Sequence, residues 1–130
     1  MLLDTSGLLC LHHWAEPFHT QARAAYRKAR VRLTHGYILA EFVALAHARR
    51  FPGLAALAFV ADLVDDPDIE IVWVDEPLHR EALSLLFARP DKTYSLCDAV
   101  SFVVMRQRDI DNALATDHHF EQEGFRRLLA

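Results

Sequence analysis

The feature that most constrains this fold is the alternation of short apolar, strand-like segments with longer helical segments along the 130-residue chain. Residues 69–74 are rich in β-branched side chains and form the clearest predicted strand. Because helical segments separate the strands, the pattern predicts an α/β fold, with a central parallel sheet of four or five strands flanked by helices on both faces. The predicted strands are residues 2–3, 31–34, 69–74, 112–116 and, as a possible fifth, 125–129.

Length and composition favour one globular domain over residues 1–130. The chain is 52% hydrophobic and 25% charged, with four glycines, five prolines and no flexible linker. Residues 37–50 are apolar on more than one face, which predicts a helix packed inside the domain. Trp73 belongs to the clearest strand and is therefore predicted to lie in the core, although a tryptophan can also stack on a nucleic-acid base.

The chain carries no sign of export or membrane insertion. Its first residues lack a signal peptide, and no apolar run approaches the roughly 20 residues of a membrane span. Cys10 and Cys97 are too few and too far apart for a disulfide framework, so we expect buried free thiols. These features predict a cytoplasmic protein with no membrane partner.

Charge is segregated along the chain although the formal net charge is only −4. Five basic residues fall within residues 23–32, and seven acids occupy residues 62–76 without an intervening base. The basic segment can neutralise phosphates of a nucleic acid or can simply be the solvated face of a helix, and the sequence leaves both interpretations open. The acidic segment is interpreted as solvated surface.

Four acids interrupt apolar sequence where a carboxylate is costly to bury without compensation. Asp4 and Asp117 each follow a predicted strand, and ligands of open parallel sheets bind at the carboxyl ends of strands. Glu41 lies about one turn into the helix after the second strand, and Asp98 lies in the first turn of the helix before residues 112–116. We therefore expect the four carboxylates to share one crevice.

Four neighbouring carboxylates repel one another unless a hard divalent cation compensates them, which predicts a Mg²⁺ or Mn²⁺ site. Such ions activate water and stabilise a leaving oxygen, as in phosphodiester hydrolysis. The sequence leaves open whether one or two ions bind. It also leaves structural alternatives: Asp4 and Asp117 can cap helices, and Ser95 with Asp98 has the spacing of a capping box. Glu41 has no such alternative.

The four acids lie in recognisable motifs, within the segments Met1–Ser6, Ala40–Glu41, Tyr94–Phe102 and Ala115–Phe120, the last followed by Gly124–Phe125. These motifs resemble those of the PIN-domain nucleases and, within them, the VapC-like toxins of toxin–antitoxin modules. The resemblance spans nearly the whole chain. It implies Mg²⁺- or Mn²⁺-dependent cleavage of RNA by the four acids, supported by the hydroxyls of Ser6 and Thr116. It also implies a homodimer and a small antitoxin partner.

Other functions fit the residues less well. A haloacid-dehalogenase phosphatase needs a second aspartate two residues after the first, where this chain has Ser6, and the aspartate and lysine pattern of a response-regulator receiver is missing. The paired histidines at 12–13 and 118–119 lack partners for a zinc set, although His118 or His119 can contact a phosphate beside Asp117. The remaining alternative is a non-catalytic PIN module that binds RNA or an antitoxin.

Overall fold

The computed structural model describes residues 1–130 and contains one five-stranded sheet in which all strand pairs are parallel. The strand order is β3-β2-β1-β4-β5. The prediction of an α/β fold with a parallel sheet is therefore confirmed. The strands are β1 (Leu2–Leu3), β2 (Leu33–His35), β3 (Glu70–Val72), β4 (Asn112–Leu114) and β5 (Arg126–Arg127).

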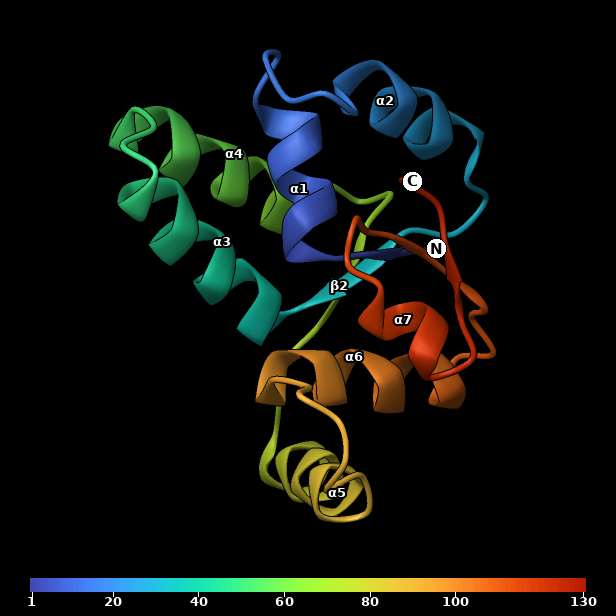
Figure 1. Cartoon of the computed structure of the whole chain (residues 1–130). Helices are drawn as coiled ribbons and strands as arrows, with labels where there is room; N and C mark the ends of the chain where they lie inside the picture. Colours follow the sequence, from blue (N-terminus) through green and yellow to red (C-terminus); the bar gives the residue numbers. More distant parts are fainter.

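Helices cover both faces of the sheet, as the sequence predicted (Figure 1). Helices α1 and α2 lie on one side of the strands, and α6 lies on the other with α5 packed against its outer surface. Helix α3 contacts both α1 and α6, and α4 packs on α3. The helices are α1 (Thr5–His12), α2 (His19–Lys28), α3 (Gly36–Ala48), α4 (Gly53–Asp65), α5 (Glu76–Phe87), α6 (Leu96–Gln107) and α7 (His119–Gln122).

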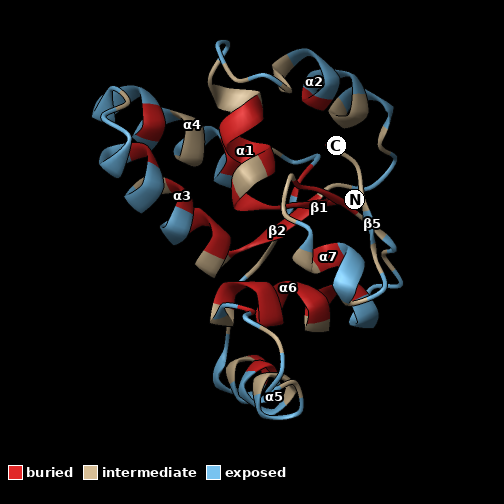
Figure 2. Ribbon diagram, in the orientation of Figure 1, coloured by how far each residue is buried: buried red, intermediate tan, exposed pale blue.

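The core consists of the central strands and the helix faces that pack on them (Figure 2). Leu2, Leu3 and Leu114 of β1 and β4 are fully buried, because each central strand has neighbours on both edges and helices on both faces. Helix α6 is buried over most of its length. No helix of the structure is both long and apolar enough to cross a membrane.

The strand order reverses between β1 and β4. The chain runs from β1 outward to β2 and β3, and then returns to the other side of β1 with β4 and β5. Leu3 pairs with Leu114 across this boundary, and the backbone N–H of Asp4 donates to the carbonyl of Leu114 at 3.2 Å. In open α/β sheets such a reversal leaves a crevice at the carboxyl ends of the strands, where ligands bind.

Two expectations about burial are wrong. Helix α3 does not lie inside the domain, because one face packs on α1, α4 and α6 while Ala40, Ala44 and Leu45 are exposed. Trp73 is 62% exposed, since β3 is an edge strand that ends at Val72. An apolar pattern shows which side chains are hydrophobic. It does not show whether a neighbouring element covers them.

Helix α1 approaches the sheet so closely that only glycine fits at position 7. A Cβ at Gly7 would lie 2.0 Å from the carbonyl oxygen of Leu114 in β4, which is backbone and has no freedom to rotate away. At Gly53, in contrast, a Cβ would meet nothing within 4 Å. The distance between α1 and β4 therefore depends on Gly7.

We predict that Gly7→Ala lowers the free energy of unfolding by at least about 2 kcal/mol, because the added methyl must displace α1 or β4. Urea denaturation followed by circular dichroism measures the change. The matched control is Gly53→Ala, which should leave stability unchanged or slightly raised because alanine favours the helix. Equal stabilities of the two variants would contradict the close approach of α1 to β4.

Candidate active site

The four predicted acids come from four different elements around the reversal of strand order. Asp4 directly follows β1, Asp117 lies three residues after β4, Asp98 is in the first turn of α6, and Glu41 is in the second turn of α3. The negative charges of Asp98 and Glu41 both act on Asp4. Asp98 and Asp117 in turn both contact His119. The fold therefore places the four acids around the carboxyl edge of the sheet, where pairs of them are linked through Asp4 and through His119.

Asp4 is the most deeply buried of the four, with 5% of its surface exposed. It occupies the N-cap position of α1, but its side chain makes no capping hydrogen bond, so the helix-cap alternative is wrong for this residue. Instead, Oδ2 accepts a hydrogen bond of 3.0 Å from the hydroxyl of Ser6. The Ser6 hydroxyl in turn accepts from the backbone N–H of Thr116 at 3.0 Å. Ser6 thus connects Asp4 to the segment that carries Asp117.

Asp98 combines a structural role with its place in the site. The predicted capping box is present: Ser95 accepts from the N–H of Asp98, and Oδ2 of Asp98 accepts from the N–H of Ser95, both at 3.0 Å. The same Oδ2 lies 3.0 Å from Nδ1 of His119. The hydrogen bonds from Ser95 and His119 both go to Oδ2, and Oδ1 of Asp98 accepts none from the protein.

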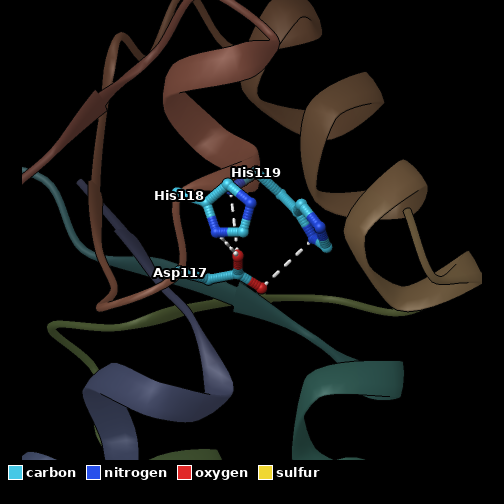
Figure 3. A group of neighbouring side chains, drawn as sticks. All are labelled: Asp117, His118 and His119. Carbon is cyan, nitrogen blue, oxygen red and sulfur yellow. Dashed lines mark hydrogen bonds and ion pairs between the residues drawn. The ribbon is translucent and has the colours of Figure 1, made fainter. Parts of the chain in front are cut away.

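Asp117 and the two histidines that follow it form a compact group (Figure 3). The ligand atoms of Asp117, His118 and His119 lie within 4.8 Å of one another. Nδ1 of His119 is 3.3 Å from Oδ2 of Asp117 as well as 3.0 Å from Asp98, and its Nε2 is 3.2 Å from the hydroxyl of Thr93. Because carboxylates only accept, Nδ1 is the donor, and His119 holds the two acids in one orientation. His118 is exposed.

Glu41 differs from the other acids because it is exposed. The expectation that it is a carboxylate enclosed by apolar neighbours is therefore wrong, since the face of α3 on which it lies is uncovered. Its charge nevertheless reaches the buried part of the site, where it contributes to raising the pKa of both Asp4 and the Cys97 thiol. Glu41 thus forms the solvent-facing side of the acidic group.

A buried histidine that the sequence did not single out joins the helices of Glu41 and Asp98. His35 is fully buried, and its Nδ1 caps α3 by accepting from the N–H of Ile38 at 3.3 Å. Its Nε2 is 2.8 Å from the hydroxyl of Ser101 in α6. Burial lowers the pKa of His35 to about 3, so the ring is neutral and can accept and donate at once. Its position directly before the helix start was the available sequence signal.

Burial raises the pKa of Asp4 to about 7, the hydrogen bond from Ser6 opposes this shift, and the charges of Asp98 and Glu41 add to it. The site thus concentrates negative charge around a carboxyl group that lacks a cationic partner. Carboxylate oxygens from several elements are the donors that Mg²⁺ and Mn²⁺ prefer, and a cation would compensate this charge. The donor set therefore fits a hard divalent ion.

We predict that Asp4→Asn stabilises the metal-free protein at pH 8 by at least about 2 kcal/mol, because each pKa unit corresponds to about 1.4 kcal/mol. A carboxyl whose pKa is raised in the folded state binds its proton more tightly there. Stability is therefore lost as the pH rises from about 4 to about 7 in the parent protein, but not in the variant. Urea denaturation in EDTA across this range measures the difference.

Asp65→Asn removes one charge at an exposed position and serves as the control. A gain in stability on Asp4→Asn that is the same at pH 4.5 and pH 8 would contradict the raised pKa of Asp4. The same result would also contradict burial as the cause of that shift.

Comparison with known proteins identifies the family of the chain. Residues 1–125 match the PIN domain family. The chain is 31% identical over 126 residues to the 23S rRNA-specific endonuclease VapC20 of Mycobacterium tuberculosis, covering 96% of this chain and 95% of the relative. The crystal structure of M. tuberculosis VapC20, a sarcin-ricin loop cleaving toxin, superposes with a TM-score of 0.89 at 29% identity and covers 99% of this chain and 98% of that one. The chain therefore belongs to the PIN-domain family and, within it, is VapC-like.

Proposed function

We propose that this protein is a Mg²⁺- or Mn²⁺-dependent endoribonuclease that hydrolyses RNA phosphodiester bonds and acts as the toxin of a toxin–antitoxin module. The observation that carries the proposal is the buried Asp4 carboxyl at the reversal of strand order, with the charges of Asp98 and Glu41 acting on it. The similarity to an rRNA-specific endonuclease over nearly the whole chain supports the same reaction class.

Asp4, Glu41, Asp98 and Asp117 would hold the ion. A bound divalent cation supplies activation of the attacking water and neutralises charge that develops on the leaving oxygen. The chain's own contribution is orientation: Ser6 fixes the Asp4 carboxylate, and the backbone N–H of Thr116 fixes Ser6. The Thr116 hydroxyl makes no hydrogen bond to the protein, so it is free to donate to an RNA phosphate.

His119 adds a second orienting contact on the other side of the site. Its ring holds the carboxylates of Asp98 and Asp117 toward one another, and the hydroxyl of Thr93 fixes the ring. These contacts connect the start of α6 with the segment after β4. A carboxylate pair held in advance loses little conformational entropy when it binds an ion or substrate. In this role His119 is a positioning residue.

Ribosomal RNA is the first substrate to test, because the M. tuberculosis relative is described as specific for 23S rRNA. A cytoplasmic site of action is part of the proposal, since Cys10 and Cys97 are both free thiols, which suit a reducing compartment.

The expected protein partners are a second copy of the chain and a small antitoxin. Helices α3 and α4 carry an apolar surface on which Leu45, Leu54 and Leu57 are 38%, 85% and 53% exposed. Exposed apolar side chains on neighbouring elements are typical of protein–protein contacts. This surface supports the existence of a protein partner, which can be a second copy of the chain or an antitoxin.

We predict that the purified protein cleaves ribosomal RNA in Mg²⁺ or Mn²⁺ and loses this activity in EDTA. Asp4→Asn and Asp98→Asn should each lower the cleavage rate at least about a hundredfold, because each removes a charge from the cation site. Gel analysis of RNA fragments measures the rate, and calorimetry measures Mn²⁺ affinity. Asp65→Asn, at an exposed position on α4, is the matched control and should cleave normally.

Cleavage that persists in EDTA, or in both site variants, would contradict the proposal. RNA binding with no cation-dependent cleavage would instead favour a non-catalytic PIN module.

We also predict that the protein alone has the mass of two 14.8 kDa chains in solution, because it exposes an apolar surface that a second copy can cover. Light scattering coupled to gel filtration measures the mass. Leu54→Lys tests whether α4 forms the contact, since a buried, unpaired charge opposes association. A single-chain mass for the parent protein at high micromolar concentration would contradict the homodimer.

A further inference from the structure

A pocket of about 320 Å³ opens directly beside the acidic site. Ser6 and Thr116, which connect Asp4 with the segment of Asp117, form part of its wall. Another part of the wall is formed by Glu16, in the loop between α1 and α2, and by Arg49, at the end of α3. The pocket therefore lies between the residues that orient Asp4 and a pair of charged side chains.

Glu16 and Arg49 form an ion pair in which one carboxylate oxygen, Oε1, accepts from the guanidinium. The Glu16 side chain is only 15% exposed, and its second oxygen, Oε2, accepts no hydrogen bond from the protein. The Arg49 guanidinium also lies 4.8 Å from the centre of the Phe51 ring, which restricts its position. Glu16 is thus a largely enclosed and oriented acceptor with a vacant oxygen.

The remaining wall of the pocket is mostly apolar and includes Leu9, Pro17 and Phe18. A pocket whose wall is partly apolar and carries a few oriented polar groups, with a volume near the lower end of the roughly 300–1,000 Å³ of ligand sites, suits a small flat ligand. Proteins that recognise unpaired RNA place single unstacked bases in such sites and read their edges by hydrogen bonds.

We propose that this pocket receives the base of a nucleotide beside the scissile phosphate and that Glu16 selects bases carrying an exocyclic amine. The inference rests on the proposed ribonuclease function. Adenine, cytosine and guanine each present an amine that can donate to Oε2 of Glu16. Uracil has only a ring N–H flanked by two carbonyl oxygens, which a carboxylate repels. Glu16 therefore disfavours uracil, while the ion pair with Arg49 holds the carboxylate in place.

The test compares oligonucleotides of adenylate, cytidylate and uridylate, of equal length, as substrates of the parent protein and of Glu16→Gln. Glutamine keeps the shape of the side chain but presents an N–H donor as well as an oxygen, so it can also pair with a uracil carbonyl. We expect a preference for adenylate and cytidylate over uridylate of about tenfold in kcat/KM, falling close to one in Glu16→Gln. Glu76→Gln, which breaks the exposed pair with Arg80, should keep the preference.

Binding provides a readout that does not depend on hydrolysis. The same oligonucleotides are titrated into Asp98→Asn and into Asp98→Asn with Glu16→Gln, and fluorescence anisotropy gives the affinities. Loss of the preference against uridylate in the second protein would support the pocket even if no RNA were cleaved, so failure of the proposed catalysis is recognised separately. Equal preferences with and without Glu16, or no preference in the parent protein, would overturn the inference. Circular dichroism and Mn²⁺ affinity confirm that Glu16→Gln is folded.

Discussion

The parallel pairing of β1 with β4 is the interaction on which the rest of the structure depends. It brings Leu3 opposite Leu114 and continues to the N–H of Asp4, so the carboxyl ends of both strands meet at one place. A slip of one residue would turn the side chain of Asp4 to the other face of the sheet. Gly7 maintains the position of α1 relative to the sheet, because the absence of a side chain lets α1 lie against the backbone of β4.

The acidic site at the boundary between β1 and β4 lowers the stability of the folded protein. Burial raises the pKa of Asp4 to about 7, and the nearby acids add to the shift instead of relieving it. The fold tolerates this charge because strong contacts surround it, namely the capping box at Ser95, the Ser6 bridge and the His119 bridge. Carboxyl groups with shifted pKa values, held in position by the surrounding structure, are typical of functional sites.

Sequence patterns predicted the fold class and the positions of Asp4, Asp98 and Asp117 at strand or helix ends, because both are local properties. They predicted the capping box of Ser95 and Asp98 for the same reason. They were wrong about the burial of Glu41, of Trp73 and of the outer face of α3. Whether a side chain is buried depends on where a neighbouring element packs. An edge strand or outer helix can have the same apolar pattern as a central one.

The sequence by itself determined the alternation of strands and helices and the placement of Asp4, Asp98 and Asp117 at their ends, since turn, capping and apolar signals act over a few residues. Only the tertiary structure decided which distant groups meet. His119 reaches Asp98 across 21 residues, Arg49 reaches Glu16 across 33, and His35 reaches Ser101 across 66. Such contacts form because packing of helices on the sheet closes long loops, and no local pattern encodes the result of that closure.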